Sequence, residues 1–517
     1  MAEKFQGGRA RRLPPELAML RVTNARHRLP EVFGTGLLIF LALGVMIGAG
    51  IFSLAGIQAA TMAGPAVIIS FLVAAVVCVL AALSYAELSS TIPVAGSAYT
   101  FTYVAFGEIW AWVVGWALVL ELVVAAALVS RVWAAYFVAT VEGFDVALPA
   151  TITEHAQIDQ GVGWVAMLLV VILMLLVMAG TQLSGRILAT IVSIKLTAVV
   201  LVIAIGATKV DSDNYSPFVP EPVSGQGARG SVLQYFLDEA AGDAFGVMGI
   251  FTAAGVIVFA FIGFDLIATA AEDAKDPRKS IPRAMLAAIG IVTALYVAMS
   301  TVLVGLRPYE ELGTDAPVSD ALQAVGTGWA ADVINIGALL ALTTVVLVVL
   351  IAQSRVLFAM GRDGLLPPAL SNVGSGSAPT RAALVAGVAA GLLALDPGTA
   401  TREQLLVLAT LFAFGFCSVA VISLRRTQPN LERGFRVPLV PLVPILSLLA
   451  TVWLSLNLEP KTWRDFAIWM AVGLALYLLY GRRHSALVGS YDPGLDDTPM
   501  PARAPRRTHG GSHRADI

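Results

Sequence analysis

The chain is poor in charged residues, and it contains hardly any cysteine. Asp, Glu, Lys and Arg make up 13% of its 517 residues, which is about half of what is usual in a soluble protein. The two cysteines, Cys78 and Cys417, lie in separate apolar runs without a CxxC or metal-binding spacing. A disulfide framework or a zinc site is therefore not expected. A net charge of −2 gives no reason to expect a nucleic-acid partner.

Histidine is also scarce, and none of the five histidines falls in an apolar run long enough to cross a membrane. This absence removes histidine-based metal sites and proton relays from such runs. It also argues against an intramembrane hydrolase, which would place histidine beside serine or a metal. We therefore expect no enzyme, no catalytic residues, no metal site and no prosthetic group. The histidines are His27, His155, His484, His509 and His513.

What the chain has in abundance is apolar side chain. Hydrophobic residues make up 57% of it, and the mean hydropathy is +0.81. A helix crosses a bilayer with about 20 mostly apolar residues, so the apolar runs predict an all-α integral membrane protein with about twelve transmembrane helices. The run 98–106 predicts a short interfacial helix before the third span. The predicted spans lie near 35–58, 64–83, 108–139, 164–181, 184–207, 246–271, 284–306, 333–360, 380–395, 404–424, 438–456 and 464–480.

The distribution of Lys and Arg predicts the orientation. With the N-terminus in the cytoplasm, most of the 33 basic residues fall in cytoplasmic segments, as the positive-inside rule requires. We therefore expect a multi-pass protein of the plasma membrane with both termini inside the cell and no cleavable signal peptide. Residues 1–33 are predicted to be a cytoplasmic N-terminal tail, 34–482 a membrane domain, and 483–517 a disordered cytoplasmic tail.

The first span has three glycines in seven residues: Gly44, Gly48 and Gly50. Glycine lowers helix propensity, and unwound backbone is tolerated in a membrane only where it is buried in protein or lines a cavity. One interpretation is a broken helix whose second half points free N–H groups at an anion. The alternative is close helix packing through a GxxxG face.

The sixth span repeats this feature, because Gly263 lies in mid-span beside Asp265. Breaks in spans one and six are typical of an inverted five-plus-five repeat. The sequence therefore predicts broken helices 1 and 6, a first repeat over about 34–207 and a second over about 246–424. Two extra helices would occupy about 438–480.

Two ionisable residues lie deep inside predicted spans. Lys195 is about ten residues, or roughly 15 Å of helix, from either end of the fifth span, so its side chain cannot reach the surface. Burying its charge costs about 2.5–3.5 kcal/mol, and such a lysine can respond by losing its proton. It is interpreted as a proton carrier or as a fixed cation that tethers the broken first helix; a plain structural bond to carbonyls is the alternative. Glu121, in the middle of the third span, is expected to interact with Lys195 directly or through water, or else to be a lone protonated glutamate.

Five stretches of the chain resemble the amino acid–polyamine–organocation superfamily, and within it the bacterial branch of the cationic amino acid transporter family. The stretch at 259–282 is the most specific, and together the five cover most of residues 30–485. They are GVMIGAGIF (44–52), AELSSTIPVAGSAYTF (86–101), FAFIGFDLIATAAEDAKDPRKSIP (259–282), SRVLFAMGRDGLLP (354–367) and FRVPLVPLVPILS (435–447).

The resemblance implies a LeuT-type fold and a set of substrate-binding residues. It implies that the substrate carboxylate rests on backbone amides of Ile47, Gly48, Ala49 and Gly50. The α-amino group would meet carbonyls of Met46, Phe259, Ala260 and Ile262. Lys195 matches a lysine linked to proton coupling in some relatives, and Glu121 matches the family's third-span glutamate. Relatives often have threonine where this chain has Ala49, which affects specificity. The side-chain pocket is expected to draw on Thr343 and Thr344.

The leading hypothesis is proton-coupled amino acid uptake by alternating access, with a small-molecule amino acid and the lipid bilayer as partners. No cofactor is expected besides the coupling proton, and no obligate protein partner is expected. The alternative is an exchanger or facilitator in which Lys195 is a permanent structural cation. A membrane sensor or a channel is a weaker hypothesis, because there is no appended signalling domain and no polar stripe. The sequence leaves open whether the substrate is cationic or neutral.

Overall fold

The structure is a computed structural model that describes residues 12–15, 18, 34–94, 96–144, 146–156, 161–180, 185–223, 230–233, 244–372 and 379–486. Over these residues the chain is helical apart from its connections, and the only β feature is an isolated bridge between Val223 and Ala244. The predicted N-terminal tail lies almost wholly outside the described residues, as does the predicted C-terminal tail from residue 487 onwards.

The helices are long and apolar enough for a membrane protein, as predicted. Within the described residues, eight helices have the length and composition to cross a bilayer, and four shorter apolar helices accompany them. Every predicted span overlaps one or more of these twelve helices. The shorter ones are α2 (Thr35–Met46), α8 (Trp164–Met178), α15 (Thr380–Leu395) and α17 (Leu442–Leu456).

The first group of helices packs around α2. After α2 the chain continues as η1 (Gly50–Leu54), α3 (Ala55–Gln58), η2 (Ala59–Ala63) and η3 (Gly64–Ala66), then α4 (Val67–Thr91). Later in the sequence, α11 (Gly246–Phe261) is followed by η5 (Asp265–Asp273) and α12 (Pro277–Leu306). α4 packs against both α11 and α12, and α12 packs against α2, so these segments form one bundle.

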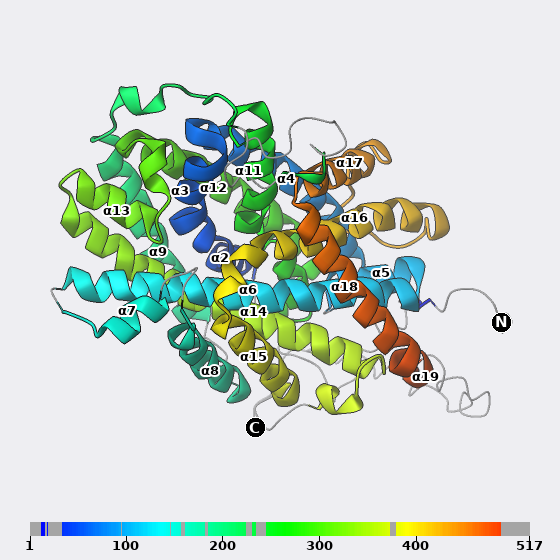
Figure 1. The fold of residues 1–517 in the computed structure, drawn as a ribbon. Coiled ribbons are helices and arrows are strands. Elements are labelled where there is room, and N and C mark those ends of the chain that lie inside the picture. Colours follow the sequence, from blue (N-terminus) through cyan, green and yellow to red (C-terminus); the bar gives the residue numbers. More distant parts are fainter. Residues whose placement is uncertain are drawn as a thin grey trace, which may run out of the picture.

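The second group is built on α6 (Glu108–Gly143) and α14 (Gly328–Arg362), which lie side by side across the middle of the molecule (Figure 1). α8 and α15 pack against each other and against both of these helices. α9 (Gly185–Ala207) contacts α14 as well as α2 and α12, so it bridges the two groups. The predicted helix at 98–106 is present as α5 (Ala98–Phe106), but its first eight residues are buried in protein.

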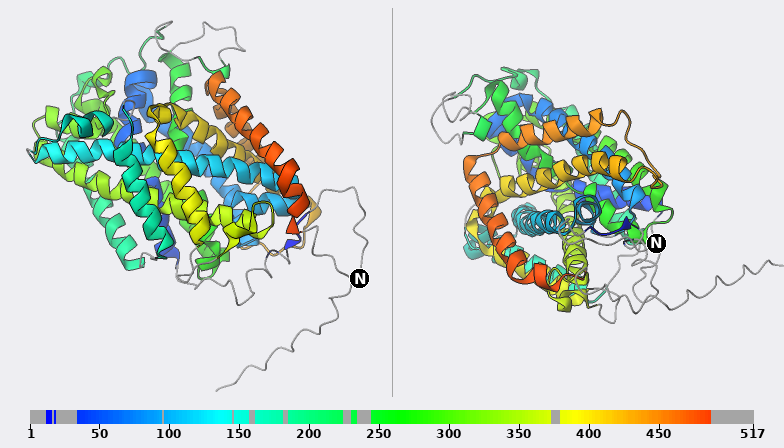
Figure 2. Two further views of the ribbon diagram at one scale, coloured as in Figure 1. Left: turned by 60° about the horizontal axis from the view of Figure 1, so that its bottom comes forward. Right: turned by 90° about the vertical axis from the view of Figure 1, so that its right-hand side faces the viewer.

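The remaining helices lie around these groups. α16 (Glu403–Thr427) contacts α4 and α11 of the first group and α6 of the second. α18 (Pro460–Leu476) runs along the edge of the molecule (Figure 2), continues as η9 (Tyr477–Gly481) and ends in α19 (Arg482–His484). Short segments cover the connections: α7 (Ala150–Ala156), η4 (Ser212–Tyr215), η6 (Tyr309–Leu312), α13 (Pro317–Ala324), η7 (Pro368–Ser371) and η8 (Pro397–Arg402).

The ends of α4, α14, α16 and α19 meet the start of α12 on one side of the molecule, which we call the terminal face. The end of the described chain is fixed there, because Ala486 N donates to the carbonyl of Asp363 (2.9 Å) and Ser485 Oγ donates to Glu108 Oε2 (2.5 Å). Ser485 and Ala486, which make these contacts, fall within the range 483–517 predicted as the C-terminal tail.

Candidate functional site

Both predicted helix breaks are present. α2 ends at Met46, and Ile47 has an extended conformation (φ −78°, ψ 92°) before the chain resumes as η1. α11 ends at Phe261, Ile262 is extended (φ −60°, ψ 134°), and Gly263 has a φ of +131°. That φ value favours glycine. Close packing, the alternative interpretation of the first span, is also present at Gly48, where a Cβ atom would lie 2.9 Å from Val345 Cγ2.

The first break leaves backbone donors unused. Ile47 N donates to the carbonyl of Leu43 (3.1 Å), which continues the pattern of α2. The amide nitrogens of Gly48 and Ala49 form no backbone hydrogen bond within the described part of the chain. Free N–H groups at the start of a helical segment attract an anion, and the resemblance places the substrate carboxylate at these amides.

The two breaks touch each other. A Cβ atom on Gly50 would lie 2.2 Å from Cβ and 2.6 Å from Cα of Ala260. A Cβ atom on Gly263 would lie within 3.0 Å of Val45 and Met46. The predicted substrate residues of the two spans, about 210 positions apart in sequence, thus come together in the core of the first helix group.

Sequence reasoning missed Tyr296 of α12, which joins the two breaks. Its hydroxyl group contacts the carbonyl oxygens of Met46 and Ala260, the second at 2.8 Å. A phenol has one proton to donate, so it can satisfy only one of these acceptors at a time. Both carbonyls belong to the set expected to receive a substrate ammonium group. No local signal marks this tyrosine, because it lies in an ordinary apolar helix.

Lys195 of α9 holds the first broken helix. Its side chain is fully buried, and Nζ donates to the carbonyl oxygens of Gly44 (2.7 Å) and Ile47 (3.2 Å). These are carbonyls at the end of α2, which the break leaves without amide partners. Within the described residues, no carboxylate forms an ion pair with Lys195. These bonds are common to the predicted tether and to the alternative, a plain structural bond to carbonyls.

Glu121 forms no hydrogen bond or ion pair with Lys195, so the direct interaction is absent from this structure. Its carboxylate is fully buried near Asp265 and Thr410, between α6, α16 and η5. Neither carboxylate oxygen forms a hydrogen bond within the described residues, and the Thr410 hydroxyl donates to Leu406 O (3.1 Å) instead. A buried carboxylate without donors is compatible with the lone protonated glutamate, which was the other interpretation.

Asp265 starts η5, as the predicted break required. Its Oδ1 accepts a hydrogen bond from Gly263 N (3.0 Å), which fixes the second break. The backbone carbonyl of Asp265 accepts from Ser97 Oγ at 3.3 Å. The second half of the broken helix is therefore fastened to the loop before α5.

The two threonines expected in the side-chain pocket have other partners. Thr343 Oγ1 accepts from Trp133 Nε1 (2.9 Å), and Thr344 Oγ1 donates to Ala341 O (2.7 Å). The residue of α14 that reaches the first break is Val345, whose Cγ2 lies 2.9 Å from where a Cβ on Gly48 would be. The neighbourhood of the free amides is therefore apolar on this side. The described residues contain no cluster of His, Cys, Asp and Glu that could hold a metal ion.

Replacing Tyr296 with phenylalanine is expected to weaken substrate binding about tenfold while the protein stays folded. The change removes the hydroxyl that contacts a carbonyl of each break, and a hydrogen bond of this kind contributes about 0.5–1.5 kcal/mol. Binding can be measured by the shift in thermal unfolding with ligand concentration. Tyr215→Phe is the matched control, because its hydroxyl also donates to a carbonyl (Thr301, 2.8 Å) but lies at the end of α12. Equal binding by both variants would contradict a role for Tyr296 at the site.

Comparison with known proteins gives matches over most of the chain. A family model described as amino acid permease matches residues 33–476. The chain is 40% identical over 453 residues to a methylthioribose transporter of Bacillus subtilis (strain 168), covering 87% of this chain and 93% of that protein. It is 39% identical over 475 residues to the branched-chain amino acid permease BcaP of the same organism, with 91% and 97% covered. A vacuolar cationic amino acid transporter 4 of Arabidopsis thaliana is 34% identical over 409 residues, with 78% and 65% covered.

Proposed function

Because the chain belongs to the amino acid permease family, we propose that it is a secondary transporter that carries an amino acid together with a proton. The family and the relatives point to a membrane transporter with a small-molecule substrate, and not to an enzyme. We further propose that it transports by alternating access, is coupled to protons and resides in the plasma membrane. The cytoplasm is assigned to the terminal face, in keeping with the positive-inside rule.

The observation that carries the proposal is the pairing of free donors with acceptors across the two breaks. Gly48 and Ala49 offer amide N–H groups, and Gly50 follows them in the same turn. Met46, Phe259, Ala260 and Ile262 lie at the ends of α2 and α11. The Tyr296 hydroxyl contacts the carbonyls of Met46 and Ala260, and Phe259 O accepts from Ile262 N. Each carbonyl oxygen has two lone pairs and can accept a further hydrogen bond from an ammonium group. An amino acid zwitterion needs hydrogen-bond donors for its carboxylate and acceptors for its ammonium group, and these two groups are attached to the same carbon atom. The two neighbouring breaks offer donors and acceptors of these kinds.

The proton role is assigned to Lys195, with Glu121 as a second candidate. The Lys195 amine touches both carbonyls at the end of α2. A neutral amine still has two N–H donors, so it can keep these contacts while its charge changes. The charge of Lys195 then acts on the substrate site, because the amine contacts the carbonyl of Ile47, which directly precedes Gly48. Substrate and proton move together if both stabilise the same state.

The architecture is proposed to be the LeuT-type inverted repeat with twelve spans. Helices broken at equivalent places in the first and sixth spans support it. So does the division into a group that carries both breaks and a group around α6 and α14. The repeat boundaries near 34–207 and 246–424 and the extra helices near 438–480 belong to the same proposal.

For the substrate, we favour a neutral amino acid with an apolar side chain. Val345 and Ile262 lie beside the breaks. The buried carboxylates of the terminal face are already engaged: Glu87 by arginines and Glu108 by Tyr477. The buried Glu121 forms no hydrogen bond within the described residues, so arginine uptake is measured beside that of leucine. The relative named for branched-chain amino acids fits this choice. The methylthioribose relative supports a second candidate, which has neither carboxylate nor ammonium group.

Uptake into proteoliposomes tests the function. Labelled leucine, arginine and methylthioribose are each offered with and without an inward proton gradient. The proposal expects gradient-driven accumulation of leucine, at least about tenfold above the other two, which corresponds to about 1.4 kcal/mol. Counterflow without any response to the gradient would identify an exchanger. Accumulation of methylthioribose alone would overturn the amino acid assignment.

A further inference from the structure

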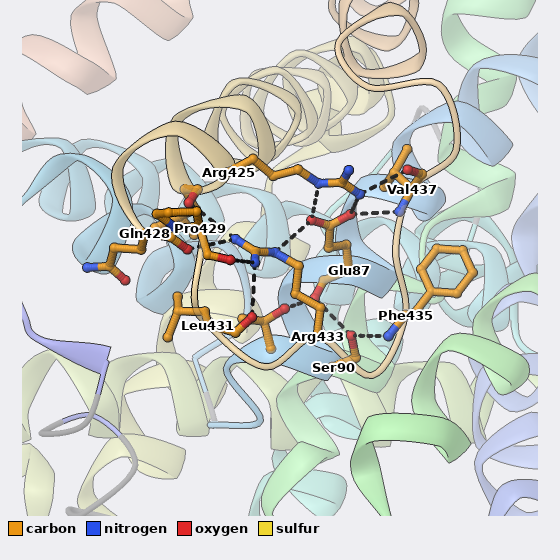
Figure 3. Close-up of polar contacts among 11 residues, drawn as sticks. Glu87, Ser90, Arg425, Gln428, Pro429, Leu431, Arg433, Phe435 and Val437 are labelled. Atoms are coloured by element: carbon orange, nitrogen blue, oxygen red, sulfur yellow. Dashed lines mark hydrogen bonds and ion pairs between the residues drawn. The ribbon is translucent and has the colours of Figure 1, made fainter.

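A buried carboxylate on the terminal face connects α4 to the loop 428–441 between α16 and α17. Glu87, near the end of α4, is 2% exposed. Its Oε1 accepts from Arg425 Nε (2.8 Å), and its Oε2 accepts from Arg425 Nη2 (2.6 Å) and from Val437 N (2.6 Å). Arg433 adds an ion pair, with Nε 3.3 Å from Oε1. Figure 3 shows the Glu87 carboxylate between the guanidinium groups of Arg425 and Arg433.

The same network fixes the backbone of the loop. Phe435 N donates to Ser90 Oγ of α4 at 3.0 Å, and Arg425 Nη2 donates to the carbonyl of Val437 at 2.9 Å. The Arg433 guanidinium group donates to four carbonyl oxygens around the end of α16 (Figure 3), those of Leu424, Gln428, Pro429 and Leu431. Glu87 and Ser90 of α4, together with Arg425 and Arg433, therefore hold the backbone of the loop.

The loop also reaches the start of α12. Arg278 forms an ion pair with Glu432, and a Cβ atom on Gly434 would lie 2.4 Å from the Arg278 carbonyl oxygen. α12 begins at Pro277, and η5 ends at Asp273, so three residues separate them. η5 is the second half of the broken helix that carries the site. The second half of the broken helix is therefore joined by a short connection to the helix that contacts the loop.

We propose that Glu87, Arg425 and Arg433 with loop 428–441 form a clasp that closes the cytoplasmic face and releases when the site opens toward the cytoplasm. This inference rests on the proposed function, since only alternating access requires such a release. α4 and α12 belong to the group that carries both breaks, whereas α16 also packs on α6 of the other group. Relative motion of the groups changes the distances across the clasp.

The chemistry of the clasp suits a contact that forms in one state and is absent in the other. A bidentate arginine–carboxylate pair requires a specific geometry, so a displacement of either partner breaks its two parallel hydrogen bonds. Removing one partner of a buried pair leaves an uncompensated charge. The side chain of Arg425 is 27% exposed, so water can reach it and replace the carboxylate when the clasp opens. Glu87 itself is shielded until then.

Locking the clasp is the first test. A Cβ atom on Gly434 would lie 2.7 Å from Cβ of Arg278, and a disulfide needs Cβ atoms about 3.5–4.5 Å apart. Arg278→Cys combined with Gly434→Cys should therefore form a disulfide on oxidation after a small shift of the loop. We expect net leucine uptake to stop in the oxidised protein and to return on reduction. Uptake at the normal rate with the disulfide closed would overturn the proposal.

Loosening the clasp is the second test, and it does not depend on transport. Ala268 of η5 is fully buried, and the two native cysteines are buried as well. A cysteine introduced as Ala268→Cys therefore reports access from the cytoplasmic face to a membrane-impermeant maleimide in inside-out vesicles. Adding Glu87→Gln, which keeps the size but removes the charge, should speed labelling about tenfold. An unchanged rate would contradict the clasp.

Glu311→Gln is the matched control for labelling, because it removes one partner of an exposed ion pair with Arg307, away from the terminal face. It should leave the labelling rate unchanged. The two tests also separate this inference from the proposed function. If the parent protein moves no amino acid, the function fails, whereas faster labelling with Glu87→Gln still supports the clasp. If the parent transports but labelling does not respond, only the clasp fails.

Discussion

Replacing Gly50 with alanine is expected to reduce leucine uptake at least about 100-fold, because the added methyl group falls where the two helix breaks meet. Its Cβ would lie 2.2 Å from Cβ and 2.6 Å from Cα of Ala260, and the second of these is backbone. A backbone atom of a packed helix cannot move aside as a flexible side chain does. Overpacking of this kind costs about 1–3 kcal/mol. The strain would push the two breaks apart, and with them the amides proposed to bind the substrate carboxylate and the carbonyls proposed to bind its ammonium group.

Gly36→Ala provides the control within the same broken helix. Nothing lies within 4 Å of the position where its Cβ would be, so the substitution should gain about 0.5–1 kcal/mol of helix stability. Initial uptake rates and thermal unfolding are measured for both variants. Normal uptake by a folded Gly50→Ala protein would mean that the contact between the breaks is not needed for transport.

The helix breaks were predictable because their cause is local. Glycine in the middle of an apolar run, with Asp265 beside it in the sixth span, weakens the helix wherever the chain folds. The depth of Lys195 followed in the same way from counting residues to the ends of its span. The hydrogen-bond partners of Lys195 could not be predicted in this way, because depth fixes the height of a side chain in the membrane but not the direction in which it points.

The same limit explains the error over Glu121. Both Glu121 and Lys195 lie in the middle of their spans, which made an interaction reasonable. In the structure α14 packs against both α6 and α9, and Glu121 turns instead toward Asp265 and Thr410. Which side of a long buried helix faces which neighbour depends on the whole packing, and an apolar helix of nearly uniform hydrophobicity carries no pattern that reveals it.

Tyr296 and Glu87 could not be found from the sequence for a related reason. Tyr296 acts through carbonyls of two other helices, at separations of 250 and 36 residues. Glu87 acts through residues about 340 positions away, and it looks like an ordinary polar residue at the end of a span. Such residues gain their meaning only when the chain brings distant backbone groups to them.

Replacing Lys195 with alanine is expected to abolish accumulation of leucine driven by a proton gradient. The change leaves the carbonyl oxygens of Gly44 and Ile47 buried without their donor, at a cost of about 1–3 kcal/mol for each. It also removes the group proposed to carry the proton. Lys209→Ala is the matched control, because that lysine follows the same helix but is exposed. Its uptake should equal that of the parent protein.

Counterflow in the absence of a gradient distinguishes the two roles of Lys195. If Lys195→Ala still exchanges labelled for unlabelled leucine but no longer accumulates it, the amine carries the coupling proton, and the tether alone is not essential. If exchange is lost as well, the variant with methionine at this position, Lys195→Met, decides the question, because it fills the space without donating. Recovery of exchange by Lys195→Met assigns the loss to the cavity, whereas continued loss assigns it to the two carbonyls. Accumulation at the parent's level in Lys195→Ala would leave the lysine without a role in coupling, and Glu121, the second candidate, would be tested next.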